Sequence, residues 1–306
     1  MYKKMLVPVD GSELAEAVIP YSKELAGRLD LDLVFLHVYG PAESEFLPIH
    51  RAYVERLAEI ARRQSQEVQQ RTGIQPGGKA VEARGEVAVG HPAEEILNYA
   101  DENDIDLILI ATHGRSGITR WAIGSVADAV VSASKVPVWL VRAGIPEEIV
   151  YDKWPTITML VPLDGSELAE SVLPHVEALA KQRGAELVDV VLVRICESPI
   201  IPSYYIYDAI LMPKVVQEME AKYRLAAEQY LAGVEKRLKD VGLRVRSEVF
   251  VGSPADTIVD FANTNPFNII VMATHGRSAS TRWVMGSVTD RVVHGVSSPV
   301  LIVRPR

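Results

Sequence analysis

Short apolar runs alternate with longer amphipathic stretches along the chain. The apolar runs are rich in β-branched residues and have the length of strands, whereas the stretches between them have the spacing of helices. In the first half the predicted strands are Lys4–Val9, Asp32–Val38, Val81–Val87, Leu107–Ala111 and Val138–Val141. The predicted helices are Leu14–Leu29, Ile49–Arg71, Pro92–Asn103 and Ser125–Ser134. This alternation predicts a parallel sheet with right-handed crossovers and helices on both faces.

The second half of the chain repeats the first. The block Ala111–Val126 returns as Ala273–Val288, and both copies read Ala-Thr-His-Gly, nine residues, then Gly-Ser. Two further repeats pair Val7–Glu16 with Val161–Glu170 and Val136–Arg142 with Ser298–Arg304. Units of this size are domains rather than the short repeats of a solenoid. We therefore predict two similar domains, residues 1–143 and 158–306, joined by a linker over residues 144–157.

Composition narrows the classes of partner. The chain has 306 residues, a net charge of −8 and a pI near 5.5, which disfavours non-specific nucleic-acid binding because that needs a basic surface. Cys196 is the single cysteine, so an intrachain disulfide and a cysteine-based zinc site are excluded, and we expect a buried thiol. Met1–Val9 has no apolar leader, and no apolar run approaches the ~20 residues of a membrane span. We expect a cytoplasmic protein with no metal site that binds neither nucleic acid nor membrane.

Polar and glycine-rich turns follow the first and fourth predicted strands. Asp10 follows the first strand, and Thr112-His113-Gly114 follows the fourth. If the strand order is 3-2-1-4-5, these two strands are neighbours that flank the point where the order reverses. Open parallel sheets bind their ligands at that point, beyond the carboxyl ends of the strands. The sequence thus predicts one ligand crevice per domain.

The residue types in these turns suit a nucleotide. Gly114 lets the backbone approach a ligand closely, Asp10 can accept hydrogen bonds from a ribose, and His113 can donate to a phosphate. Gly124-Ser125 open a helix whose free N–H groups bind phosphate oxygens, and Arg115–Ile123 would wrap the phosphates. The equivalents in the second half are Gly276, Asp164, His275, Gly286-Ser287 and Arg277–Met285.

Simpler structural roles compete with these. Ser125 and Ser287 suit helix N-caps in the absence of any ligand, and Asp10 before Gly-Ser suits an Asx-turn. The stretch Cys196–Pro213 is longer and more apolar than its counterpart Gly40–Pro48. It is consistent with an ordered, packed loop, or with a lid or docking surface.

Over nearly its whole length the chain resembles the universal stress protein family in its tandem form. ATP-binding members carry Gly-x-x-Gly, nine residues, then Gly-Ser or Gly-Thr. This chain shows Ala111–Gly114 before Gly124-Ser125, and Ala273–Gly276 before Gly286-Ser287. The opening Pro-x-Asp and Leu36-His37-Val38 also look like that family. The resemblance implies two Rossmann-like domains of the adenine nucleotide alpha hydrolase-like type, each a five-stranded parallel sheet of order 3-2-1-4-5 with helices on both faces.

The resemblance also implies a ligand and its contacts. Asp10 would hold the ribose, the backbone of Val38 would meet the adenine edge, and the glycine-serine turn would hold phosphates of ATP, ADP or AMP, with or without Mg²⁺. The first candidate site comprises Pro8, Val9, Asp10, Val38, Ala111, His113, Gly114, Arg115, Gly124, Ser125 and Val126. The second comprises Pro162, Leu163, Asp164, Ile195, Ala273, His275, Gly276, Arg277, Gly286, Ser287 and Val288.

The chain departs from the family pattern at two kinds of position. Alanine stands in place of the first motif glycine at Ala111 and Ala273, where it crowds a ligand and disfavours positive φ. Arg194 in the second half stands where the first half has His37. The alanine is common to both halves, whereas the arginine distinguishes the second site from the first.

Family members pair through their last strands. Each half of this chain ends in such a strand, Pro137–Arg142 and Pro299–Arg304, and an unpaired strand edge favours pairing. We expect the two halves to form an intramolecular pseudo-dimer, and a second chain to be a candidate for further dimerisation. The sequence does not identify a protein partner.

Three functions stay open. The leading hypothesis is a stress-response protein that binds an adenine nucleotide and acts through conformation or partner binding, because no Walker lysine and no water-activating carboxylate accompany the glycine-rich turns. The alternatives are a slow ATPase or nucleotide hydrolase that uses His113 or His275, and a nucleotide-free scaffold, which Ala111 and Ala273 would favour.

Overall fold

A computed structural model of the protein describes residues 2–73, 80–112, 123–142, 156–197, 213–265, 267–276 and 285–305. The first half contains β1 (Lys4–Pro8), α1 (Glu13–Glu16), α2 (Ile19–Leu29), β2 (Asp32–Tyr39), η1 (Pro41–Phe46), α3 (Leu47–Thr72), β3 (Ala83–Val89), α4 (Pro92–Glu102), β4 (Leu107–Ala111), α5 (Ser125–Ala133) and β5 (Val138–Val141). The second contains β6 (Ile157–Pro162), α6 (Glu167–Glu170), α7 (Leu173–Arg183), η4 (Ala185–Leu187), β7 (Val188–Cys196), α9 (Pro213–Asp240), β8 (Arg244–Val251), α10 (Pro254–Thr264), β9 (Ile269–Ala273), α11 (Ser287–Gly295) and β10 (Val300–Val303). Most of the predicted linker and of Cys196–Pro213 lies outside the described residues.

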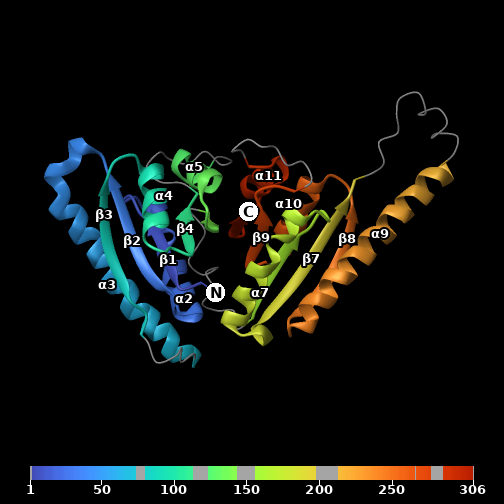
Figure 1. The fold of residues 1–306 in the computed structure, drawn as a ribbon, viewed down its shortest axis with the longest axis horizontal. Helices are drawn as coiled ribbons and strands as arrows, with labels where there is room; N and C mark the ends of the chain where they lie inside the picture. The colour runs from blue at the N-terminus through green and yellow to red at the C-terminus, as the bar shows by residue number, and fades with distance from the viewer. Residues whose placement is uncertain are drawn as a thin grey trace.

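The strands form one ten-stranded sheet in the order β3-β2-β1-β4-β5-β10-β9-β6-β7-β8. Each half therefore has the predicted order 3-2-1-4-5, and all pairings within a half are parallel. Figure 1 shows the halves side by side, with the long helices α3 and α9 along the outer flanks. The predicted fold class is confirmed.

The two halves join through their last strands. β5 and β10 pair in antiparallel direction, with Trp139 opposite Leu301 at the centre, so the predicted pairing of the last strands within the chain is confirmed. Two arginines cross the junction reciprocally. Arg142 donates to the carbonyl of Val296 at 3.1 Å, and Arg304 donates to the carbonyl of Ser132 at 3.3 Å. Each half thus stabilises the last turn of a helix in the other.

Helices cover both faces of the sheet. Successive residues of β1 alternate between the two apolar layers, with Met5 and Val7 in one and Leu6 in the other, as the two-residue period of a strand requires. The first layer includes residues of α2, α3, α7 and α9, and the second includes residues of α4, α5, α10 and α11. Both layers run through both halves, so the apolar core is continuous across the junction.

The predicted helix Leu14–Leu29 is wrong in one respect, because it is two helices. α1 ends at Glu16, and α2 begins at Ile19 after a turn. Pro20 has no N–H to donate to the carbonyl of Glu16, so one helix cannot run through this position unbroken. Pro174 occupies the same place in α7, and the second half shows the same break. The third strand also begins later than predicted, at Ala83 rather than Val81.

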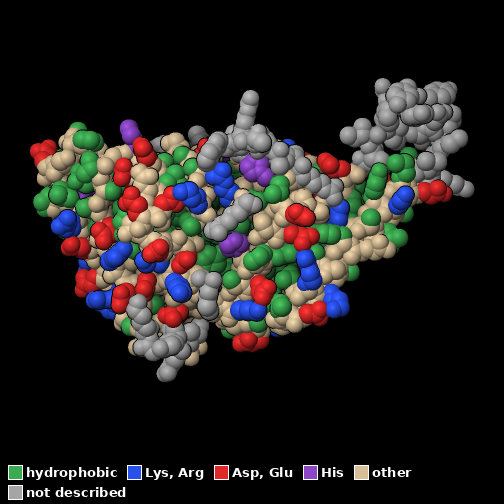
Figure 2. Space-filling model, viewed as in Figure 1, with side chains coloured by type: hydrophobic (Ala, Val, Ile, Leu, Met, Phe, Trp, Pro, Cys, Tyr) green, Lys and Arg blue, Asp and Glu red, His purple; other side chains and the backbone are tan. Residues whose placement is uncertain are grey.

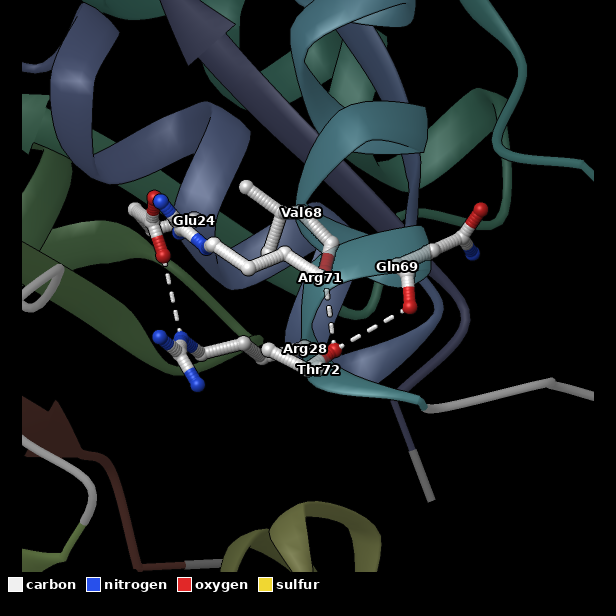
Figure 3. Close-up of polar contacts among 6 residues, drawn as sticks. All are labelled: Glu24, Arg28, Val68, Gln69, Arg71 and Thr72. Carbon is white, nitrogen blue, oxygen red and sulfur yellow. Dashed lines mark hydrogen bonds and ion pairs between the residues drawn. The ribbon is translucent and has the colours of Figure 1, made fainter.

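A buried ionic cluster ties α2 to α3 in the first half (Figure 3). The carboxylate of Glu24 is 3.0 Å from Arg28 Nε and, through its other oxygen, 3.0 Å from Arg71 Nη2. The side chains of Glu24 and Arg28 are 3% and 10% exposed. A charge in this position is stable only while its partners remain, because water does not compensate for their loss.

The surface carries mixed charges. On the face in Figure 2, acidic and basic side chains are interspersed over the described part of the molecule. None of the described helices is long and apolar enough to cross a membrane.

Replacing Glu24 with alanine should lower the free energy of unfolding by about 3 kcal/mol, because Arg28 would be left buried without its carboxylate. Glu177→Ala is the matched control. Glu177 also pairs with the residue four positions on, Lys181, but that pair is solvent-exposed, and its loss should cost less than about 0.5 kcal/mol. Urea denaturation followed by circular dichroism measures both, and equal losses would contradict the importance of burial.

Candidate functional site

Each half has an aspartate turn directly after its first strand. Oδ1 of Asp10 accepts hydrogen bonds from the backbone N–H of Ser12 at 3.0 Å and from its hydroxyl at 2.6 Å. Gly11 between them has φ 79°, a conformation that favours glycine. Asp164 repeats this with Ser166, at 2.9 and 2.6 Å. The Asx-turn role is confirmed, and it occupies one oxygen of each carboxylate.

The aspartate turn meets the glycine-rich turn in the second half. Gly276 lies so close to Asp164 that a Cβ on this glycine would overlap Asp164 Oδ2. A side chain at this position would therefore have to displace the Asp164 carboxylate. The two parts of the predicted site, which are far apart in the sequence, lie in contact.

The ends of both glycine-rich turns are fixed by backbone hydrogen bonds. Gly286 donates to the carbonyl of Thr274 at 2.8 Å, and Gly124 donates to that of Thr112 at 2.6 Å. Thr274 in turn donates its N–H to Val303 of β10 at 2.8 Å. Each turn is thus attached to the last strand of its own half. His113, Gly114, Arg115 and Arg277 lie outside the described residues.

The helices that follow these turns begin with an exposed serine. Gly124 and Gly286 are the N-caps, with no side-chain cap, and Ser125 and Ser287 are the first helical residues. The suggestion that these serines are N-caps is therefore wrong, because glycine takes that position in an extended conformation. The first-turn N–H groups of α5 and α11 have no partner within their helices, as at any helix start.

A cavity of about 830 Å³ lies at the carboxyl ends of β6, β7 and β9. Ten of the predicted residues line it: Pro162, Leu163, Asp164, Ile195, Ala273, His275, Gly276, Gly286, Ser287 and Val288. This volume falls within the usual range of ligand pockets, roughly 300–1,000 Å³. A smaller cavity of about 360 Å³ lies at the opposite ends of β1–β3, near Lys4 and Asp32 and away from the predicted residues.

The cavity also has lining residues that the sequence patterns did not single out as site residues, including Arg194, Cys196, Tyr223 and Thr274. The sequence comparison of the two halves identifies Arg194 as a difference between the repeats, but it does not indicate that this residue lines the cavity. Thr274 lies inside the repeated Ala-Thr-His-Gly phrase, which was the available signal for it. Tyr223 comes from α9, and only the packing of that helix reveals it.

The first half places its predicted residues in the same way. Pro8 ends β1 and Val38 lies near the end of β2, while Val9 and Asp10 follow β1 directly. β1 lies between β2 and β4, which ends at Ala111. Gly124, Ser125 and Val126 start α5. The described residues of the first site therefore share one edge of the sheet.

Alanine fits the start of the glycine-rich turn. Ala111 and Ala273 are the buried last residues of β4 and β9, where the backbone is extended. Positive φ among described non-glycine residues occurs only at Asp30 and Asp104. The carbonyl of Ala273 accepts a hydrogen bond from the Thr289 hydroxyl at 2.8 Å. The expected conflict with a left-handed backbone is therefore wrong, since these residues do not adopt one.

His275 is the described histidine of the site. Its Nδ1 lies 3.1 Å from the hydroxyl oxygen of Thr274. The other ring nitrogen, Nε2, is buried and has no hydrogen-bond partner among the described residues. A buried polar atom without a partner carries the cost of an unmade hydrogen bond.

A half-buried tyrosine binds the short helix that follows the aspartate turn in each half. Tyr53 donates to Glu16 and Tyr230 donates to Glu170, both at 2.9 Å. Burial, reinforced by these carboxylates, raises the pKa of both tyrosines far above the ordinary value. Both hydroxyls therefore stay protonated and act as donors at any physiological pH.

Comparison with known proteins agrees with the arrangement. A family model described as the universal stress protein family matches residues 1–142 and 157–304. A universal stress protein of Methanocaldococcus jannaschii is 32% identical over 154 residues, which cover 48% of this chain and 93% of that protein. One from Mycobacterium tuberculosis is 24% identical over 309 residues, covering 98% of this chain and 96% of its own length. A solved universal stress protein structure from Archaeoglobus fulgidus covers 98% of both chains with a TM-score of 0.62 at 20% identity, which shows a shared fold.

Replacing Gly276 with alanine should lower the free energy of unfolding by about 1–3 kcal/mol, because the new Cβ displaces Asp164 from its turn. Gly233→Ala is the matched control. Gly233 lies in α9, and a Cβ there meets nothing within 4 Å, so this change should stabilise by up to about 1 kcal/mol. Thermal and urea unfolding would compare the two, and a Gly276→Ala protein as stable as wild type would rule out the close contact.

Proposed function

Because the chain belongs to the universal stress protein family in its tandem form, we propose that it binds an adenine nucleotide in each half. ATP is the leading ligand, and ADP and AMP share the groups that the site would hold. The protein acts in the stress response through nucleotide-dependent conformation or partner binding rather than rapid turnover.

The single observation that carries this proposal is the convergence of three groups on the second cavity. Asp164, Gly276 and Ser287 come from the ends of β6 and β9 and the start of α11, and all line it. A carboxylate beside a ribose, a glycine that permits close approach, and a helix start that binds phosphate are the parts of a nucleotide site.

Each part has a defined task in the proposal. The N–H groups and hydroxyl at the start of α11 would bind phosphate oxygens, and the helix dipole would favour the negative charge. Asp164 keeps one oxygen in its turn, which fixes the carboxylate against the ribose. His275 lines the cavity and would donate to a phosphate oxygen. Mg²⁺ would enter with the phosphates.

The direct test is calorimetric titration of nucleotide-stripped protein with Mg-ATP, ADP and AMP. We expect saturable binding of at least one of them, because the cavity has a carboxylate for the ribose and a helix start for the phosphates. Mass spectrometry of ligand released from freshly purified protein would identify the occupant. Absence of binding at millimolar concentrations of all three nucleotides would contradict the proposal.

Ser287→Pro tests the phosphate end specifically. Proline is well tolerated at the first helical position, and the preceding Gly286, with φ −62° and ψ 146°, already has the conformation that a residue before proline requires. The change removes one N–H and the hydroxyl, and it should weaken ATP binding to the second half by roughly tenfold or more. Ser287→Ala, which keeps the N–H, should lose less.

Ser125→Pro makes the same test in the first half, where Gly124 has φ −63° and ψ 148°. The double variant should bind ATP roughly tenfold or more weakly at both sites, while its melting temperature stays close to that of wild type. Undiminished affinity in the double variant would place the phosphates elsewhere.

A further inference from the structure

The two halves differ in charge at one strand end of the candidate site. Arg194 follows Val193, which pairs with Pro162 at the end of β6, and it lines the second cavity beside Asp164. In the first half His37 takes this position, where it is 2% exposed and its Nδ1 lies 2.9 Å from the carbonyl oxygen of Val9. The same strand position therefore holds a buried imidazole in one half and a cavity-lining cation in the other.

The guanidinium of Arg194 lies on a fixed platform. Its Cζ is 4.8 Å from the ring centre of Tyr230. The Tyr230 hydroxyl donates to Glu170, whose other oxygen accepts from Arg237 at 2.5 Å. The first half has the equivalent tyrosine–glutamate pair, Tyr53 and Glu16, without an arginine above it. The tyrosine–glutamate pair therefore forms without an arginine on the tyrosine ring, so packing alone does not explain Arg194.

The described residues do not neutralise Arg194. Within the described part of the chain, no carboxylate pairs with it and no acceptor takes a hydrogen bond from it. Arginine stays charged at physiological pH, and its donors lie along the edge of the group, so stacking one face on Tyr230 leaves them available. Among the described residues that line the cavity, it is the one lysine or arginine.

The order of groups along the cavity matches a ligand with two anionic ends. β6 lies between β7 and β9, so Asp164 lies between Arg194 on one side and Gly276 with the start of α11 on the other. Neighbouring strands are about 4.8 Å apart, which separates β7 from β9 by about 10 Å. In dinucleotide folds an acidic residue binds the free ribose hydroxyl, or a nearby arginine accommodates a phosphate at that position; the second half of this chain offers both groups, and Arg194 would offset the charge of Asp164.

We propose that the second half selects an adenine nucleotide that carries an additional phosphate on the ribose 2′ or 3′ oxygen, and that Arg194 is the residue that recognises it. This proposal rests on the proposed function. The first half, with His37 buried at the equivalent position, takes the nucleotide without that preference.

The test compares adenosine 3′,5′-bisphosphate, adenosine 2′,5′-bisphosphate and AMP by calorimetry. A Ser125→Pro background weakens binding by the first half, so that the tighter of two binding events reports the second half. One of the two bisphosphates should bind about tenfold to a hundredfold more tightly than AMP, the usual gain from a charged hydrogen-bonded pair. Arg194→Gln should abolish that ratio, and Arg194→Lys should keep part of it. Arg246→Gln removes an exposed charge on β8 and should leave the ratio unchanged.

The ratio of the affinity for a bisphosphate to the affinity for AMP distinguishes phosphate recognition by Arg194 from a structural role of this residue. Equal affinities for AMP and both bisphosphates in wild type would overturn the assignment of Arg194 and leave nucleotide binding intact. A ratio that persists in Arg194→Gln would also overturn it, as would a loss of affinity that is the same for all three ligands. Failure of every nucleotide to bind would overturn both proposals together.

Discussion

The structure depends on the antiparallel pairing of two strands in the centre of the molecule, β5 (Val138–Val141) and β10 (Val300–Val303). Both strands are buried, so neither half can leave this edge unpaired without exposing both apolar side chains and backbone groups. The turns of the candidate sites depend on the same strands, because Thr112 and Thr274 donate to Val141 and Val303. The junction therefore holds the sheet together and also fixes where each glycine-rich turn begins.

The candidate sites follow from strand direction. Parallel neighbours bring their carboxyl ends to one edge of the sheet, so an aspartate after β6 and a glycine after β9 meet although more than a hundred residues separate them in sequence. The contact between Asp164 and Gly276 is so close that a side chain on the glycine would displace the carboxylate. A small residue at the turn and a carboxylate at the strand end are thus one structural unit in the second half, and Asp10 with Ser12 repeats the aspartate turn in the first half.

Much of this was readable from the sequence because the signals are local or repeated. The bounds of β4 and β5 match the predicted ones, since continuous apolar runs mark strands covered on both faces. The split after Glu16 follows from Pro20, which cannot donate a hydrogen bond to Glu16. Ser125 is not the N-cap, because the extended Gly124 before it takes that position. The Glu24–Arg71 pair could not be predicted, because it depends on how α2 packs on α3. Tyr223 belongs to the cavity wall for the same kind of reason, through the position of α9.

The place of β10 in the middle of the sheet has a consequence for synthesis of the chain. The first half has all five of its strands once Val141 has emerged, yet β5 keeps an open edge until Val300–Val303 follows. At usual elongation rates that interval lasts on the order of ten seconds. During this interval, two nascent chains on one mRNA have identical unpaired β5 edges. Antiparallel pairing of these two edges would resemble the native β5–β10 junction. Crowded translation is therefore expected to favour exchanged dimers of this protein, in which the first halves of two chains are joined in place of the two halves of one.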